Sequence, residues 1–405
     1  MTDATPERLI LSGARLIYGT GARAVTERAV VVEGGRIGAV IPEGRHPAGA
    51  TVLRLDGLTL LPGLINCHVH LCLGAEADPV RALAEDAPAT TAIKAVVRAR
   101  QTVEAGVTTV RDLGGRDGVA LAVRDAVRAG LIPGPRVLAA ARGVCMTGGH
   151  GWRFGREADG PDDVRRAVRE QLKAGADVIK LFATGGVMTP GVEPGSPQLT
   201  PEEIRAAIEE AKKAGRRTAA HAQAEAGIAA CVDAGITTIE HGIFLTEAIA
   251  SKMAREGIAL VPTLVAPEAI IAGGIAAGIP EFAVRKSEAV RGRHVESFQL
   301  ALRLGVPIAA GTDAGTPLNP HGSIVPELAL MVKAGMAPLA AISAATSVAA
   351  RVLGLEAEIG RIAPGLAADL VAVAGTPGEQ IGALADVRLV LAGGRVVLDR
   401  LGAAR

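Results

Sequence analysis

Hydrophobic and polar residues follow different patterns in the middle of the chain and at its two ends. Both ends contain short runs rich in β-branched residues that are separated by glycine turns, such as RLILSGARLIYG and AVVVEGGRIGAVI near the start and VRLVLAGGRVVLD near the end. Runs of this length bounded by turn residues predict short strands. The two ends could therefore pair into one sheet or sandwich.

Between about Pro62 and about Gly360, strand-type runs alternate with helical ones. The segment TPEEIRAAIEEAKKAG predicts a helix with Thr200 as its N-cap, Pro201 at its first position and Gly215 just past its end. Strands are expected in RRTAAHA, ITTIEHG, IALVPTL and VPIAAGTDAG, and helices in EAGIAACVDAG, TEAIASKMAREG and a charged stretch near 280–304. Repeated βα units of this kind favour an α/β protein with a (β/α)8 TIM barrel, although an open doubly wound sheet is an alternative.

Composition excludes several classes of function. The chain of 405 residues has 43 Lys and Arg against 42 Asp and Glu, a net charge of +1, and no basic stripe. Nucleic acid is therefore not an expected partner. No apolar run is long enough to cross a membrane, and the N-terminus lacks the pattern of a signal peptide, so we expect a cytoplasmic protein. Its four cysteines form no CxxC pair, which fits free thiols in a reducing compartment.

Histidines are concentrated at the ends of predicted strands. Five stand there: His68 and His70 in LINCHVHL, His150 in MTGGHGW, His221 in TAAHAQ and His241 in TTIEHG. His321 follows the last predicted strand, whereas His46 and His294 have no evident role. His68 and His70 are two residues apart, so on a strand both rings point to the same side. Asp313, in IAAGTDAG, would add a carboxylate to these imidazoles, and together they suit zinc or a similar divalent metal.

Lys180 lies inside the apolar run ADVIKLFATGGV. A lysine is seldom buried without a partner, so this position calls for one. One alternative is a side chain that extends out of the strand to a surface carboxylate. A single histidine at a strand end is also more often structural than metal-binding. The order HxH, lysine, histidine, histidine and aspartate, each at the end of a successive strand, favours a metal site.

These motifs resemble those of the metal-dependent amidohydrolase superfamily. HVH, VIKLFATGG, AHA, IEHG and GTDAG match its ligand pattern in order, and the chain ends resemble its small β-sandwich. The resemblance implies a β-sandwich domain of residues 1–61 plus 361–405 and a barrel of residues 62–360. Within the superfamily, TGGHG and ATGGVMTPG are most similar to prolidase-like dipeptidases of the Xaa-Pro and Xaa-Arg type and to ochratoxin-type amidohydrolases.

The resemblance also implies a site and a reaction. It implies two divalent metal ions, with zinc expected, one held by His68, His70 and Asp313 and the other by His221 and His241, with Lys180 as a carboxylated bridging ligand. A metal-bound hydroxide would attack the amide carbonyl of a dipeptide or N-acyl amino acid. Asp313 would act as general base and then acid, His150 would stabilise the oxyanion or orient the carbonyl, and His321 would bind the substrate carboxylate.

Other functions are compatible with part of the pattern. A cyclic amidase or an imidazolonepropionase-like hydrolase would use the same scaffold, and a deaminase is a weaker alternative because mononuclear deaminases generally lack the bridging lysine. A non-catalytic binding protein with this fold would bind no metal. The resembled group includes large assemblies, so a homo-oligomer with a small-molecule amide or peptide substrate is expected.

Overall fold

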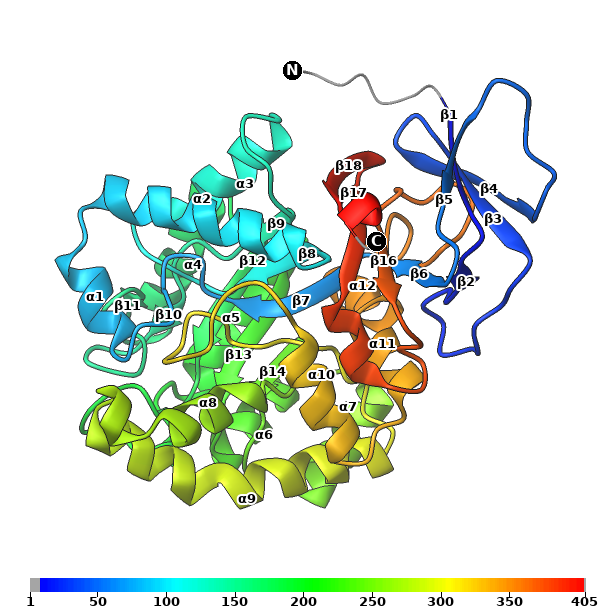
Figure 1. The fold of residues 1–405 in the computed structure, drawn as a ribbon. Coiled ribbons are helices and arrows are strands. Elements are labelled where there is room, and N and C mark those ends of the chain that lie inside the picture. The colour runs from blue at the N-terminus through cyan, green and yellow to red at the C-terminus, as the bar shows by residue number, and fades with distance from the viewer. Residues whose placement is uncertain (1–7, 404–405) are drawn as a thin grey trace.

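In the computed structural model of the chain, residues 8–403 are described. Figure 1 shows the strands of both chain ends side by side, next to a larger body in which helices surround a central group of strands. The strands of the chain ends are β1 Arg8–Ser12, β2 Arg15–Leu16, β3 Arg28–Glu33, β4 Arg36–Pro42, β5 Thr51–Arg54, β6 Leu58–Pro62, β16 Leu370–Ala374, β17 Val387–Ala392 and β18 Arg395–Asp399.

These terminal strands form two sheets. One has the order β4-β3-β1-β5, and the other has the order β18-β17-β16-β6-β2. In the second sheet β16 runs antiparallel to β6, with Leu370 opposite Pro62 and Ala374 opposite Leu58. The predicted pairing of the two chain ends into one sheet is thus confirmed. One apolar cluster contains side chains from both sheets, among them Leu11 and Leu389.

The middle of the chain alternates strands and helices, as the sequence pattern predicts. Its strands are β7 Leu64–Val69, β8 Val107–Asp112, β9 Arg136–Ala139, β10 Val144–Cys145, β11 Arg156–Glu157, β12 Val178–Phe182, β13 Arg217–Ala222, β14 Thr238–His241 and β15 Ala259–Val261. The helices are α1 Pro79–Glu85, α2 Pro88–Glu104, α3 Val119–Arg128, α4 Pro161–Ala174, α5 Pro201–Lys213, α6 Glu225–Asp233, α7 Glu247–Glu256, α8 Val265–Gly273, α9 Glu281–Arg303, α10 Val325–Lys333, α11 Pro338–Ala344 and α12 Ser347–Leu353. Short helical turns are η1 Ile275–Ala277, η2 Ile381–Ala385 and η3 Leu401–Ala403.

The expected closed barrel is only partly formed. The parallel strands fall into one group with the order β7-β8-β9 and another with the order β11-β10-β12-β13-β14-β15. The predicted strand VPIAAGTDAG is not a strand, although its backbone bridges the groups: the N–H of Cys67 donates to the carbonyl of Ala310 at 2.9 Å, and that of Ala309 donates to Leu260 at 3.0 Å. Within this segment only isolated bridges form, at Ile308 and Ala314, and the φ of 57° at Asp313 is itself incompatible with a strand.

Two helix predictions are confirmed in detail. The helix α5 begins after Thr200, whose side chain accepts from the Glu203 N–H, while the Glu203 carboxylate accepts from the Thr200 N–H. This reciprocal capping box satisfies two N–H groups that the helix itself leaves free. The charged stretch near 280–304 is the long helix α9.

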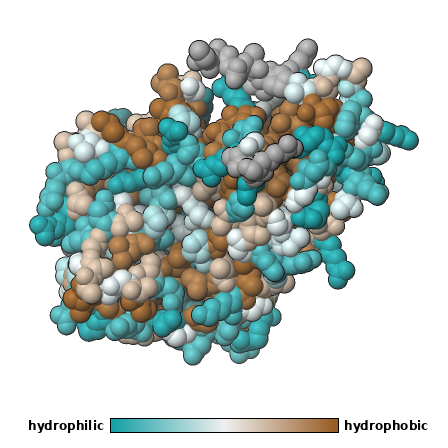
Figure 2. All heavy atoms as spheres, viewed as in Figure 1, coloured by the Kyte–Doolittle hydropathy of each residue, from teal (hydrophilic) through white to brown (hydrophobic). Residues whose placement is uncertain are grey.

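The outer surface and the cysteines carry little further information on function. Figure 2 shows hydrophilic and hydrophobic residues interspersed over the visible face. Among the helices within residues 8–403, none has the length and apolar composition that crossing a membrane requires. All four cysteines are buried, and burial raises the pKa of each thiol to about 12, so they act as apolar packing groups.

Candidate active site

Most of the residues singled out from the sequence gather at one edge of the central strands. His68 is in β7 with His70 directly after it, Lys180 is in β12, His221 is in β13, and His241 ends β14. The parallel register places Phe182 opposite His221 and Ala222 opposite His241, so these strands end at the same level. Carboxyl ends of parallel strands are where barrel enzymes carry their active sites.

Five imidazole rings form a continuous row at this edge. The ring centroids of His70 and His68 are 5.3 Å apart, those of His68 and His241 5.2 Å, those of His241 and His221 4.6 Å, and those of His221 and His150 4.4 Å. All five side chains are buried. The structure therefore brings together residues from four separate segments of the chain.

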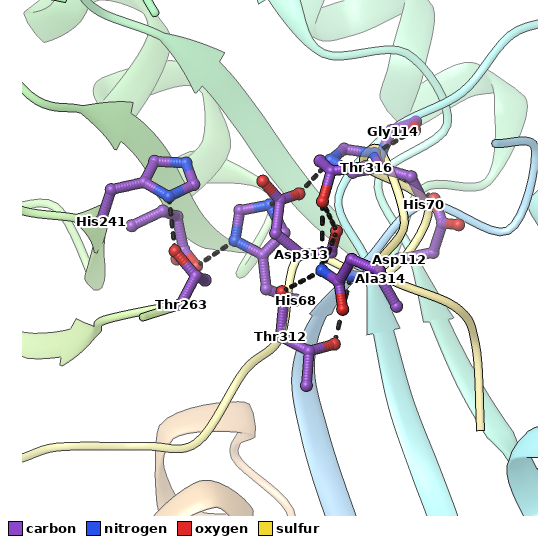
Figure 3. Close-up of polar contacts among 12 residues, drawn as sticks. His68, His70, Asp112, Gly114, His241, Thr263, Thr312, Asp313, Ala314 and Thr316 are labelled. Atoms are coloured by element: carbon purple, nitrogen blue, oxygen red, sulfur yellow. Dashed lines mark hydrogen bonds and ion pairs between the residues drawn. The ribbon is translucent and has the colours of Figure 1, made fainter. Parts of the chain in front are cut away.

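Asp313 faces one end of this row (Figure 3). Its Oδ1 lies 3.3 Å from His68 Nε2 and 3.2 Å from His70 Nε2. One ligand atom from each of the three side chains can be chosen so that all lie within 4.8 Å of one another. Two imidazole nitrogens and a carboxylate oxygen are the usual ligands of zinc and similar ions. The donor set therefore fits a divalent metal.

A protein partner fixes the other ring nitrogen of each candidate ligand. His68 Nδ1 donates to Glu240 Oε2 at 2.9 Å, and His70 Nδ1 donates to the Gly114 carbonyl at 2.7 Å. His221 differs, because its Nε2 donates to the Gly185 carbonyl at 2.9 Å and leaves Nδ1 with the lone pair. Histidines that ligate metals usually donate their second nitrogen in this way, which fixes the ring and its tautomer.

His241 is fixed by a hydroxyl group. The Thr263 hydroxyl donates to the Pro262 carbonyl at 2.7 Å, so its oxygen can accept from His241 Nδ1, which lies 2.7 Å away. Both residues have positive φ values, 70° for His241 and 54° for Thr263, as does Asp313. Such conformations are uncommon outside glycine, most of all for a β-branched residue such as Thr263, and are concentrated at functional sites. The backbone at this edge is thus shaped to aim these side chains.

A buried ion pair lies behind His68. Glu240 and Arg111 are almost fully buried, and Arg111 Nη2 lies 2.8 Å from Glu240 Oε1. Arg111 also donates to the Cys67 carbonyl at 2.7 Å and to the Thr238 hydroxyl at 3.0 Å. The second Glu240 oxygen is then free to hold His68. Sequence reasoning missed both residues; the signal was a charge within each of the apolar runs VTTVRDL and ITTIEH.

Burial controls the charge of most groups in the row. It lowers the pKa of His68, His221 and His241 well below the ordinary value, and it lowers that of His150 to about 3. These rings are therefore neutral at pH 7, the form that binds metals.

The pair of His70 and Asp313 behaves differently. Burial disfavours both charged forms. For His70 the hydrogen bond and attraction to Asp313 outweigh burial and raise the pKa, and for Asp313 the neighbouring His68, His70 and Lys180 outweigh it and lower the pKa. At neutral pH Asp313 is a carboxylate.

Lys180 has no hydrogen-bonding or ionic partner within residues 8–403. Its side chain is 1% exposed, and its Nζ lies over the Phe182 ring, 5.3 Å from the centroid. Burial lowers its pKa from 10.5 to about 8, although Glu240 and Asp313 oppose this change. A significant fraction of this amine is thus neutral near physiological pH and available as a nucleophile.

A cavity opens over the row of histidines. Its lining includes the five rings, Lys180 and Asp313 together with side chains from several loops and from the helices α1, α8 and α9, chiefly Leu73, Pro79, Val80, Trp152, Arg153, Phe154, Val187, Met188, Thr189, Pro190, Gln223, Ile243, Ala266, Pro267, Ile270, Val290 and His294. Most are apolar. Gln223 and His294 were not singled out from the sequence, because a glutamine after a strand and a histidine inside a long helix give no local signal.

His321 does not line this cavity. Its Nε2 faces the carbonyl oxygens of Leu73 at 3.0 Å and His70 at 3.2 Å. It therefore fixes the chain directly after the HxH motif, and a contact with a substrate carboxylate stays a prediction.

The loop that carries Thr189 is fastened by a buried lysine. Lys286 in α9 is 2% exposed and donates from Nζ to the carbonyls of Thr189 at 2.8 Å and Val192 at 2.5 Å. The Thr189 hydroxyl in turn lies 2.9 Å from His150 Nδ1. One cation thus links α9 to the position of the His150 ring.

Replacing Lys286 by Met should loosen this loop. Loss of the charge-assisted hydrogen bonds leaves two carbonyls without their donor, so the free energy of local opening should fall by about 2 kcal/mol. Hydrogen exchange of residues 187–196 would measure it. The control is Arg285→Met, which removes an exposed ion pair with Glu193 in the same loop and should change opening by less than about 0.5 kcal/mol. If both substitutions changed the free energy of local opening equally, the view that Lys286 holds this loop in place would be contradicted.

Known proteins share this fold and much of this sequence. Residues 59–397 match the model of the Amidohydrolase family. An ochratoxinase from Aspergillus niger is 33% identical over 352 residues, which cover 80% of this chain and 71% of that protein. A Xaa-Pro dipeptidase solved with methionine in its active site is 32% identical, with a TM-score of 0.89 and coverage of 96% of this chain and 99% of that one. A prolidase complexed with N-methylphosphonate-L-proline is also 32% identical, with a TM-score of 0.89 and coverage of 97% and 100%.

The chain belongs to the Amidohydrolase family. It is a hydrolase that acts on C–N bonds, and its relatives support the hydrolysis of amides. The family resemblance inferred from HVH, AHA, IEHG and GTDAG is thereby confirmed. Proteins with this fold have a TIM-type barrel, which agrees with the mixed α/β arrangement seen here.

Proposed function

We propose that this protein cleaves the amide bond of a dipeptide or an N-acyl amino acid at a site for two divalent metal ions, with zinc as the expected metal. The observation that carries the proposal is the row of imidazoles that ends at Asp313 and lines one cavity with an unpaired, buried Lys180. His68, His70 and Asp313 would hold one ion, and His221 and His241 the other. When bound, such a pair of ions lowers the pKa of water and polarises a carbonyl group.

Lys180 is proposed to bridge the two ions as a carbamate. Its neutral amine would form an N–C bond to carbon dioxide and release one proton, which turns an amine into an anion. The lowered pKa of Lys180 and its lack of a protein partner support this role. An anionic ligand also suits a cavity that would otherwise hold two cations with Asp313 as its one lining carboxylate.

The chain's own groups would position the substrate and move its protons. Asp313, a carboxylate at neutral pH, would accept a proton from the attacking water and deliver it to the leaving nitrogen. His150 lines the cavity at the other end of the row and would donate a hydrogen bond from Nε2 to the carbonyl oxygen, provided that Nδ1 accepts from the Thr189 hydroxyl. The apolar lining would exclude water from the developing charge.

The substrate class is supported by the cavity and by the relatives. Arg153 stands at the cavity lining with its guanidinium 4.8 Å from the centroid of the Trp152 ring, and it has no ion pair within residues 8–403. A free cation there would suit the carboxylate of an amino acid. The ligands of the two solved relatives, methionine and a phosphonate derivative of proline, are amino acid compounds of this kind.

Two domains are proposed for the chain. The sheets that share an apolar cluster would form a β-sandwich domain of residues 1–61 plus 361–405, of which residues 1–7 and 404–405 lie outside the described part. Residues 62–360 would form the hydrolase barrel. A homo-oligomer also stays a prediction, which light scattering after size exclusion would test.

Removal and return of metal tests the proposed function. Purified protein should hydrolyse members of a library of dipeptides and N-acyl amino acids, lose this activity on dialysis against a chelator, and regain it with zinc. Cyclic amides and aminated bases in the same library test the rival reactions. Hydrolysis that survives complete metal removal, or turnover of cyclic amides alone, would contradict the proposal.

A further inference from the structure

Two polar side chains in the cavity have buried atoms without a hydrogen-bond partner. The first belongs to Gln223, which follows β13 and is 5% exposed. Its backbone is firmly held, since its N–H donates to the Thr184 hydroxyl at 2.9 Å and its carbonyl accepts from the Phe244 N–H at 2.9 Å. Its side-chain amide makes no hydrogen bond within residues 8–403, and Oε1 is buried. The amide is thus presented to the cavity by a fixed backbone.

The second is His294, in the middle of α9 and 2% exposed. Its Nε2 lies 2.7 Å from the Pro262 carbonyl, which can only accept, so the proton of the neutral ring is on Nε2. Nδ1 is then an acceptor, and it has no partner in the described part of the chain. Buried polar atoms of this kind are rare in folded proteins and point to a ligand or water that is not part of the chain.

The surroundings of these two groups define what could pair with them. Ile243, Ala266, Pro267, Ile270 and Val290 line the same cavity and offer only apolar surface. Asp313 is the single carboxylate in the lining, and the proposed mechanism already uses it. A cationic group on the substrate would therefore be buried without a countercharge, and an anionic group would face the His294 acceptor with only the neutral Gln223 amide to pair with it.

We propose that Gln223 and His294 each offer a hydrogen-bond acceptor to an uncharged donor, such as a carboxamide or hydroxyl group, on an otherwise apolar part of the substrate. This inference rests on the proposed function and names its substrate class: amides in which the side chain within the cavity is neutral and polar at its tip. The Gln223 amide can also donate if it rotates by half a turn, so a carboxamide can form two hydrogen bonds with it.

Four dipeptides that differ only at one position test this specificity. They carry Gln, Met, Glu or Lys side chains, which have similar lengths but different charge and hydrogen bonding. For the unaltered protein, kcat/KM should be highest with Gln and lowest with Glu and Lys. In Gln223→Met the preference for Gln over Met should fall about tenfold or more, because the hydrogen bond is lost on the protein side.

Two further variants sharpen the test. In Gln223→Glu the kcat/KM of the Lys dipeptide should rise relative to that of the Gln dipeptide, since a carboxylate now balances the ammonium group. His294→Gln can keep the bond to Pro262 while removing Nδ1, and it should also reduce the preference for Gln over Met. The control is Gln299→Met, a substitution at an exposed position in α9. Its ratio of kcat/KM for the Gln dipeptide to kcat/KM for the Met dipeptide should match that of the unaltered protein.

Calorimetric binding of the free amino acids separates this inference from the proposed function. If glutamine binds more tightly than methionine, and Gln223→Met removes the difference, the inference stands even when no dipeptide is cleaved, whereas the proposed function fails. If dipeptides are cleaved but the Gln-to-Met ratio is unchanged in Gln223→Met and His294→Gln, the inference is overturned while the proposed function stands. Water alone would then satisfy these two groups.

Discussion

Replacing Asp313 by Asn should lower kcat by about a thousandfold or more while the protein stays folded. The substitution removes the carboxylate that is proposed to shuttle the proton, and general acid–base catalysis alone contributes about a hundredfold to ten-thousandfold. It also removes a proposed metal ligand. Steady-state kinetics on the best dipeptide, together with metal analysis of the variant, would measure both effects.

The fold should tolerate this change because the backbone of Asp313 is held independently of its carboxylate. Its N–H donates to the His68 carbonyl at 2.8 Å, and its own carbonyl accepts from Thr316 Oγ1 at 2.9 Å and Asn319 Nδ2 at 3.0 Å. Asparagine also tolerates the positive φ of this position better than most residues do. Asp313→Ala should therefore destabilise the fold more than Asp313→Asn does. Near wild-type kcat in Asp313→Asn would rule out the proton-shuttle role.

Replacing Lys180 by Met should abolish hydrolysis and yet stabilise the metal-free protein. Methionine has a similar length and no charge, so the cost of burying an unpaired amine disappears. The lowering of the Lys180 pKa from 10.5 to about 8 corresponds to about 3 kcal/mol that opposes folding at neutral pH. Denaturant unfolding of both proteins in chelator would measure this gain.

The pH dependence of this gain has a definite sign. Between pH 8 and 10.5 the unfolded chain binds more protons at Lys180 than the folded chain does, so the cost decreases as the pH rises through this window. The advantage of Lys180→Met should therefore be complete below about pH 8 and small above about pH 10.5.

Lys286→Met is the matched control, since it is the same substitution at the other buried lysine. Lys286 donates to two carbonyls, so its loss should destabilise the protein. Destabilisation of both variants by similar amounts would contradict the view that Lys180 lacks a partner in the metal-free protein.

The sequence predicted the local elements of this fold well because their signals are local. The helix α5 has its cap, its proline and its terminal glycine within one segment, and α9 follows from a long charged stretch. The segment around Asp313 was wrongly predicted as a strand. Its apolar residues suit a strand, but the close approach of Gly311 to Val261 and His68, where a Cβ atom would clash, and the positive φ of Asp313 depend on neighbouring strands.

The histidine row was also foreseeable, since strand order alone brings its members to one edge. The contacts that hold and surround these rings could not be predicted. The hold of Glu240 on His68, the fastening of the Thr189 loop by Lys286 and the unpaired state of Gln223 are properties of the packed molecule. A charge within the apolar run ITTIEH marks Glu240 as unusual, but no pattern along the chain names the partners of these residues, because those partners lie far away in sequence.

Metal content measured together with the state of Lys180 is the most direct test of the proposed site. Protein purified with zinc and isotope-labelled bicarbonate would be examined by elemental analysis and by carbon NMR. We predict two metal ions per chain, a labelled carbamate signal that is absent from Lys180→Met, and hydrolysis of small amides by the same preparation. One ion or none per chain, with no carbamate and no cleavage, would contradict the binuclear site and return Lys180 to a structural role.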